Sequence, residues 1–229
     1  MNAFQTTYRC ASIDIGVINL AFCVTEFTEK LDGTFAFSLV HVEHTRIGNT
    51  SETIHELAKK LLGVYSTSEA LKYSTLDFVF IEQQLSRAVR NTALAYVSMA
   101  YFETLNAATT GPNGHTRVVF VPPKNKFRAV RYAFPDFVFH SINFERRGRE
   151  LKKLSVEISR MLFDTFEVTV GLDAFTKFKT KLDDVSDVFL QSFAFFLTMF
   201  PSRSARGNGR SFIGVEQHRQ SEDADEKAK

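Results

Sequence analysis

Apolar and polar positions alternate with two different periods along this chain, and each period predicts a different kind of element. Residues 8–27 alternate between apolar and small or polar side chains, which predicts two adjoining strands with a bend at Ile15 and Gly16. Residues 34–43 are typical of a third strand. Short apolar runs at 76–81 and 118–121 predict two interior strands, the second ended by Pro122 and Pro123.

Longer segments with helical character follow or separate these strands. They lie at 51–62, with Ser51 or Asn49 as the N-cap, and at 86–108, 124–134, 145–166 and 182–200. Three strands in succession, then strands alternating with helices, predict an α/β fold with a mixed five-stranded sheet flanked by helices. We expect residues 1–201 to form one domain and the polar segment 202–229 to be a disordered tail.

Composition narrows the class of protein only slightly. The 229 residues are 44% hydrophobic, which suffices for one sizeable core, and the net charge of +2 indicates no partner by itself. Residues 117–181, however, carry 14 Lys and Arg against 7 Asp and Glu. Such a local excess attracts polyphosphates, although a solvated basic face without a ligand is also common.

Cysteine usage and hydropathy favour an intracellular protein. Cys10 and Cys23 lie in apolar stretches, which predicts two buried free thiols in a reducing compartment, and two cysteines are too few for a structural zinc site. No stretch reaches the roughly 18 apolar residues of a membrane span, so no membrane partner is expected. The first residues resemble neither a secretion signal nor a transit helix.

Three groups of acidic residues lie beside or inside strongly apolar segments. Asp14 lies between Ile13 and Ile15, Glu82 ends an apolar strand, and residues 183–187 place three aspartates at the start of the last helix. A carboxylate in such surroundings requires a compensating cation. If the two strands are neighbours, Asp14 and Glu82 face one crevice, and several converging carboxylates are suited to divalent metal and phosphodiester hydrolysis.

Each acid also has a purely structural interpretation. Asp14 could be a turn aspartate, and Glu82 could pair with Arg87 or Arg90 on the following helix. Acids in a first helical turn cap the helix and favour its dipole, which accounts well for Asp183. It accounts poorly for Asp187, which lies in the second turn among apolar residues. Asp184 and Asp187 are three residues apart and so project from one face.

The order of these motifs resembles the RuvC-type Holliday junction resolvases. The resemblance rests on Asp-Ile-Gly at 14–16, Ile-Glu-x-Gln at 81–84 and Asp-Asp-x-x-Asp at 183–187, and it is strongest to the branch of poxviruses, other large DNA viruses and fungal mitochondria. It implies a ribonuclease-H-like fold, a homodimer, Mg²⁺ dependence and paired nicks across a four-way junction. The family's acids fall on Asp14, Glu82, Asp184 and Asp187. A viral protein would act in the host cytoplasm or nucleus.

The resemblance leads to a mechanistic hypothesis. Asp14 is expected to bridge two Mg²⁺ ions, for which Mn²⁺ would substitute, with Glu82 on one of them and Asp184 and Asp187 completing the set. A dimer would match the symmetry of a branched DNA substrate. Phosphate contacts are expected from a group of basic residues, namely Lys124, Lys126, Arg128, Arg146, Arg147, Lys152 and Lys153.

Other functions stay open at this point. A nuclease for RNA–DNA hybrids would use the same metal chemistry, and a non-catalytic junction-binding module could share the fold. Sugar kinases and actin-like ATPases also begin with a strand carrying Asp-x-Gly. They need a second Gly-rich phosphate loop, which residues 60–170 do not offer.

Overall fold

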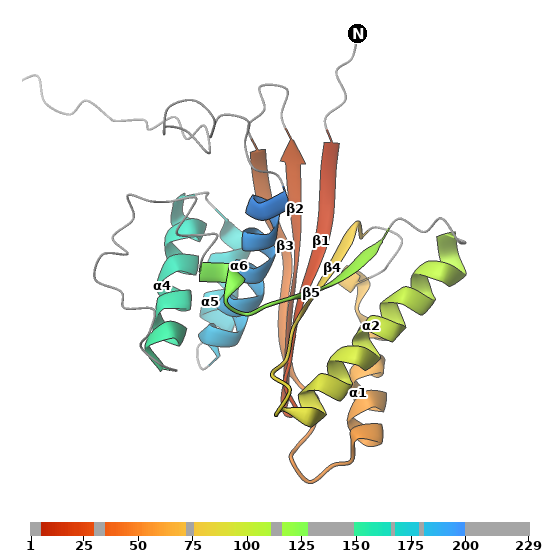
Figure 1. The fold of residues 1–229 in the computed structure, drawn as a ribbon. Helices are drawn as coiled ribbons and strands as arrows, with labels where there is room; N and C mark the ends of the chain where they lie inside the picture. The colour runs from red at the N-terminus through yellow and green to blue at the C-terminus, as the bar shows by residue number, and fades with distance from the viewer. Residues whose placement is uncertain are drawn as a thin grey trace, which may run out of the picture.

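The structure, a computed structural model, describes residues 6–29, 35–71, 76–110, 116–127, 149–165, 168–178 and 181–199. A single five-stranded sheet forms its centre (Figure 1). Its strands are β1 (Thr6–Ile15), β2 (Asn19–Glu29), β3 (Phe35–Arg46), β4 (Phe78–Glu82) and β5 (Arg117–Val121). They lie in the order β3-β2-β1-β4-β5. β1, β2 and β3 pair antiparallel, whereas β4 is parallel to β1 and β5 is parallel to β4. The mixed sheet predicted from the sequence is therefore confirmed.

Helices cover both faces of the sheet. α1 (Ile54–Thr67) and α2 (Val89–Thr110) lie on one face, and α4 (Arg149–Thr165), α5 (Thr169–Lys177) and α6 (Leu182–Met199) lie on the other (Figure 1). A short 3₁₀ turn, η1 (Glu69–Leu71), follows α1. Each face has its own apolar core, which we call the α1–α2 face and the α4–α6 face.

The two cores follow from the two-residue period of the strands. In β1, Ala11, Ile13 and Ile15 point to the α1–α2 face and are fully buried there. Cys10 points to the opposite face, and Ser12 and Asp14 share that direction because they are two and four residues further on. Neighbouring residues of one strand thus enter different environments. Both cysteines are buried and free, as predicted.

The start of α1 corrects one expectation. Thr53, not Ser51 or Asn49, is the N-cap: its hydroxyl accepts the backbone N–H of Glu56, whose side chain accepts the backbone N–H of Thr53 in return. Asn49 instead organises the preceding turn, where its carboxamide oxygen accepts the Ser51 N–H at 2.9 Å. The capping box at Thr53 is favoured over a cap at Ser51 or Asn49 because it satisfies the backbone N–H groups of both Thr53 and Glu56.

α5 was not predicted, and its sequence explains why. The helix begins with two β-branched residues, has no side-chain cap and contains Gly171, all of which lower its intrinsic helix propensity. Gly171 lies against the ring of Phe163, where an added Cβ would come within 2.5 Å of a ring carbon. Tertiary packing against α4 therefore requires the glycine that local propensity disfavours.

Other parts of the sequence prediction lie partly outside the described residues. The expected helix at 124–134 is described only to residue 127, and the helix at 145–166 only from residue 149. Residues 202–229, and with them the boundary at 201, are outside the described ranges, so the tail stays a prediction. In the described part of the chain, no helix is both long and apolar enough to cross a bilayer.

Candidate active site

Two carboxylates meet where parallel strands end. β1 and β4 pair in register up to Ile13 and Ile81. The next residues, Asp14 and Glu82, therefore lie side by side at the carboxyl ends of these two parallel strands. Glu82 is close enough to Asp14 to raise the pKa of its carboxyl. The prediction that these strands are neighbours, on which the common crevice depended, is confirmed.

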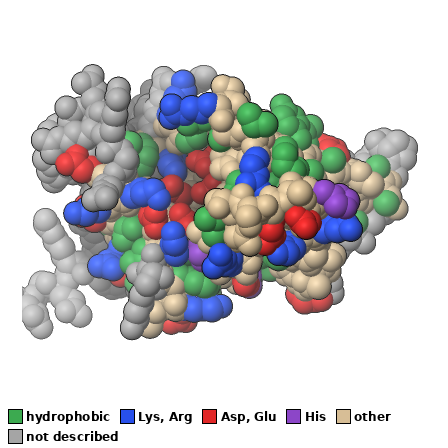
Figure 2. Space-filling model, turned by 90° about the horizontal axis from the view of Figure 1, so that it is seen from below, with side chains coloured by type: hydrophobic (Ala, Val, Ile, Leu, Met, Phe, Trp, Pro, Cys, Tyr) green, Lys and Arg blue, Asp and Glu red, His purple; other side chains and the backbone are tan. Residues whose placement is uncertain are grey.

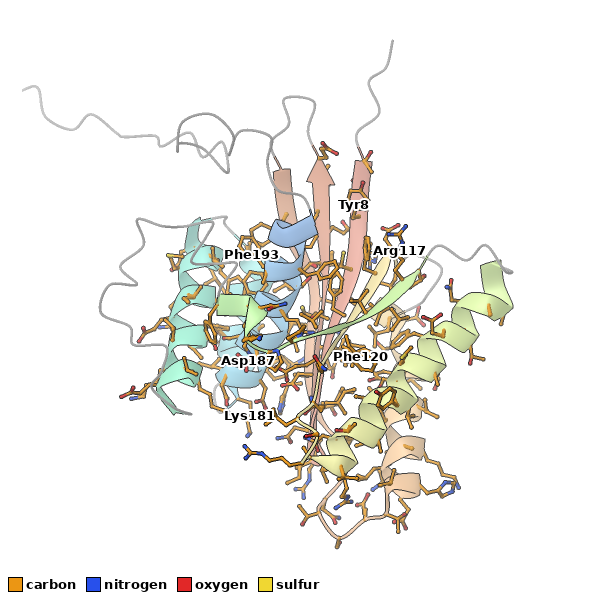
Figure 3. All side chains as sticks on the ribbon, viewed as in Figure 1. Tyr8, Arg117, Phe120, Lys181, Asp187 and Phe193 are labelled. Carbon is orange, nitrogen blue, oxygen red and sulfur yellow. The ribbon has the colours of Figure 1, made fainter. Side chains whose placement is uncertain are left out.

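α6 brings a third carboxylate to the same point. Asp187 lies between α6 and the sheet (Figure 3), close enough that its charge acts on Asp14. Burial raises the pKa of Asp14 well above its usual range, and the charges of Glu82 and Asp187 raise it further, while Lys126 opposes the shift. Three acids therefore crowd one small volume and resist simultaneous ionisation.

Lys126 supplies the positive charge within this group. Its Nζ lies 2.8 Å from Asp187 Oδ2 and 3.8 Å from Glu82 Oε1, and only 8% of its side chain is exposed. The sequence predicted a phosphate contact on a basic helix for this lysine. Its actual position is among the acids, and contact with DNA stays a prediction. The alternative pairing of Glu82 with Arg90 is wrong, because Arg90 donates to the backbone carbonyls of Thr50 and Glu52.

The other two aspartates of α6 have separate partners. His44 Nε2 lies 3.1 Å from Asp184 Oδ2, and the ammonium group of Lys152 pairs with Asp183. For Asp183, burial raises the pKa, but the hydrogen bond and charge of Lys152 outweigh it and lower the pKa overall. The charge of Asp183 is thus compensated by Lys152, apart from the group around Asp14, and its expected role as a helix cap stays a prediction.

A cleft opens beside Asp14, with a volume of about 440 Å³. Ala21 and the turn between β1 and β2 line one part of it. Thr50 and Asn91 line the wall that belongs to the α1–α2 face. Asp184, Lys152 and Lys181 line the wall that belongs to the α4–α6 face. Seen from below, acidic side chains gather in a hollow with Lys and Arg side chains around them (Figure 2), and Lys181 lies near the start of α6 (Figure 3).

The donor set fits a divalent cation in its chemistry, although the described residues do not hold three His, Cys, Asp or Glu side chains in ligand geometry. Asp187 Oδ1 is buried and has no hydrogen-bond partner. Such an orphaned acceptor, next to a carboxyl whose pKa is raised by other carboxyls, is a position where a cation lowers the free energy. Lys126 currently compensates part of this charge.

The predicted basic residues fall into three groups. Lys124 and Lys153 are exposed, and Lys152, which pairs with Asp183, lines the cleft. Lys126 is buried among the acids. The remaining arginines, Arg128, Arg146 and Arg147, lie outside the described residues.

Sequence reasoning missed two residues of the site. His44 gave no signal because it lies on an edge strand 140 residues before Asp184. Lys181 stands two residues before the acids of α6 and belongs to the basic segment, but nothing in its spacing set it apart. The inward position of Lys126 had one signal: it follows the end of β5, the strand next to that of Glu82.

Comparison with known proteins identifies the fold. Neither the protein-family models nor the curated proteins match the sequence. Among solved structures, the yeast mitochondrial Holliday junction resolvase Ydc2 is similar at 15% identity, with a TM-score of 0.52 over 82% of this chain and 78% of that protein. The chain has the ribonuclease-H-like fold.

A weaker similarity extends to RuvC of Thermus thermophilus. Its structure in complex with a Holliday junction substrate gives a TM-score of 0.49 at 13% identity, over 83% of this chain and 96% of that protein. A second structure of the same protein gives the same TM-score at 16% identity. At 15% identity, the similarity to Ydc2 establishes the fold only.

Proposed function

We propose that this protein is a metal-dependent, structure-specific endonuclease that resolves four-way DNA junctions by paired nicks. The observation that carries the proposal is the meeting of Asp14, Glu82 and Asp187 at one sheet edge, with a buried carboxylate oxygen that lacks a partner. Support also comes from the structural neighbour Ydc2, which is a Holliday junction resolvase.

In this proposal Asp14, Glu82, Asp184 and Asp187 hold two Mg²⁺ ions. When bound, these ions would supply a water of lowered pKa and stabilise the leaving 3′ oxygen. The chain itself fixes the acids on rigid elements: two sit at strand ends and two sit on one helix. α6 also excludes water from behind the site, because Val185, Val188 and Phe189 are fully buried.

The lysines then act on phosphate oxygens. Lys152 and Lys181 line the cleft beside Asp14, and exposed Lys153 follows on α4. Ammonium groups at these positions would bind and orient the DNA backbone without reading its sequence. Lys126, already within 2.8 Å of Asp187, would offer its N–H groups to a phosphate oxygen that enters among the acids.

We further propose that the active form is a homodimer formed through α2. Apolar side chains occur on both sides of this helix: Leu94 and Phe102 are buried against the α1–α2 core, whereas Val89 and Tyr96 are 67% and 60% exposed. Val89 and Tyr96 are seven residues apart and share a face, and Ala93 and Ala100 lie between and beyond them. Small residues on such a face allow a second helix to approach closely.

The central experiment compares three labelled substrates: a four-way junction, a linear duplex and an RNA–DNA hybrid, each with Mg²⁺ and with chelator. The proposal expects paired cuts in the junction only, and only with Mg²⁺. Preferential cutting of the hybrid would instead establish the hybrid-nuclease alternative. Binding of the junction without cutting would establish a non-catalytic module.

The dimer is tested by light scattering coupled to size-exclusion chromatography. Val89→Glu should shift the wild-type dimer toward monomer, because a carboxylate would be buried in an apolar interface. Ile54→Glu, an equally apolar but less exposed position on α1, is the matched control and should leave the mass unchanged. A wild-type protein that elutes as a monomer at micromolar concentration would contradict this part of the proposal.

A further inference from the structure

We infer that His44 is a positioning residue that sets the orientation of the Asp184 carboxylate for metal binding. The inference rests on the proposed function. Its geometric basis is the 3.1 Å contact between His44 Nε2 and Asp184 Oδ2, in which 12% of the histidine side chain and 20% of the aspartate side chain are exposed. A carboxylate only accepts hydrogen bonds, so Nε2 is the donor.

The sheet register places His44 in the row of the active site. His44 pairs with Ala21 on β2, and Ala21 pairs with Asp14 on β1. Directly paired residues point to the same face, so His44 and Asp14 both face α6. Ala21 carries only a methyl group, and it lines the cleft beside Asp14. Because Ala21 is small, it leaves space for the side chain of Asp184, which comes from α6.

Packing fixes the imidazole ring from the other side. The ring of Phe178, just after α5, lies edge-on to it with 6.1 Å between centroids. The histidine therefore reaches Asp184 from an edge strand, with its backbone paired to β2 and its ring packed against Phe178. A hydrogen bond from a fixed donor selects one orientation of the carboxylate, which is how residues behind metal ligands sharpen a metal site.

The partners of the three α6 aspartates differ in a way that suits this role. Asp183 and Asp187 pair with the ammonium groups of Lys152 and Lys126. Asp184 pairs with an imidazole instead. An imidazole N–H can occupy one carboxylate oxygen and leave the other for a cation. Asp184 is thus oriented by a partner that competes little with a metal.

The test measures Mn²⁺ binding by titration calorimetry in the absence of DNA, for the wild type, His44→Ala and His44→Gln. The alanine variant should bind Mn²⁺ about 10- to 100-fold more weakly, the usual effect of removing a group behind a metal ligand. The glutamine variant, whose amide N–H can replace Nε2–H, should recover most of the affinity. In junction cleavage, the alanine variant should need correspondingly more Mg²⁺ and regain most of its rate at saturation.

The matched control is His41→Ala. His41 is on the same strand, but it stacks on Phe22 of the α1–α2 core and pairs with Glu43, so its loss should not alter Mn²⁺ affinity. Unchanged Mn²⁺ affinity in His44→Ala would overturn the positioning role, as would equal losses in the alanine and glutamine variants. A wild type that binds Mn²⁺ but cuts no junction would overturn the proposed function alone.

Discussion

The two faces of the sheet are built from the same strands, yet they serve different purposes. The α1–α2 face is packed with aliphatic side chains, and its buried hydroxyl groups, on Tyr65 and Ser98, bond to each other at 2.9 Å. The α4–α6 face is aromatic and carries buried polar atoms without partners, including those of Ser12, Ser186 and Asp187. The carboxylate oxygen of the site that lacks a partner, Asp187 Oδ1, therefore lies on the α4–α6 face.

The contrast is sharpest between two residues adjacent in sequence. Ile13 is completely buried on the α1–α2 face, whereas Asp14 faces the acids of the site. Natural active sites commonly lower the stability of the protein that carries them. The comparison therefore predicts that changes at these two positions have opposite effects on activity and on stability.

Asp14→Asn should have the largest effect on activity. It removes the carboxylate shared by both proposed ions, so cleavage should fall by roughly a thousandfold or more, given that metal ions supply several kcal/mol of transition-state stabilisation. Junction binding should persist because the phosphate contacts lie elsewhere. The rate is measured with labelled junction under single turnover. Near wild-type cutting would show that the metal assignment is wrong.

The same variant should be more stable than the wild type when metal is absent. The folded-state pKa of Asp14 lies above its unfolded value near 3.8, so the folded protein holds this proton more tightly. Between pH 3.8 and the folded-state pKa, the wild-type protein therefore loses stability as the pH rises. The loss is complete only above the folded-state pKa. Melting curves at rising pH should separate the two proteins progressively, and Mg²⁺ should raise the melting temperature of the wild type only.

Ile13→Ala should have the opposite profile. Removing a fully buried aliphatic side chain costs about 2–5 kcal/mol, while the acids on the other face keep their positions. The melting temperature should fall, and the cleavage rate well below melting should stay close to that of the wild type. Ile13→Val, with an expected cost of about 0.5–1.5 kcal/mol, gives the same comparison if the alanine variant does not fold. Loss of cleavage in folded Ile13→Val would show that the α1–α2 face and the active site do not act independently.

Neutralising Lys152 and Lys153 together should weaken junction binding and leave the nicked strands unchanged. Each lost phosphate contact should flatten the log–log salt dependence by about 0.9 on duplex arms. Lys59→Ala, an exposed lysine of α1 on the other face, serves as control and should leave the slope unchanged. An unaltered slope of the salt dependence in the double variant would show that Lys152 and Lys153 of α4 do not contact DNA.

Asp183→Asn should have the smallest effect. Its partner Lys152 has a side chain that is 55% exposed, and ion pairs of this kind contribute about 0–1 kcal/mol. Cleavage should therefore fall by less than about fivefold, against a near-complete loss in Asp187→Asn. Equal losses of cleavage at the two positions would show that Asp183 and Asp187 do not have distinct roles.

Periodicity in the sequence predicted the sheet, its five strands and the helices α1, α2, α4 and α6, because burial of one strand face or one helix stripe leaves a local pattern. The sequence also drew attention to two acids, because a carboxylate between Ile13 and Ile15, or after the apolar strand ending at Ile81, is costly without a compensating cation. The structure brings these two acids together, and their role in catalysis stays a prediction. Local patterns failed for α5, where contact between Gly171 and Phe163 overrides helix propensity.

Only the tertiary structure decided how the charges are paired. The only sequence signal for the inward position of Lys126 was its place after β5, and nothing local indicates that His44 reaches Asp184 across 140 residues. Those contacts depend on strand order, on the register that aligns His44, Ala21 and Asp14, and on the way α6 crosses the sheet. The energy of a charge depends on neighbours brought together by folding, whereas the energy of an apolar pattern depends mainly on the residue and its period.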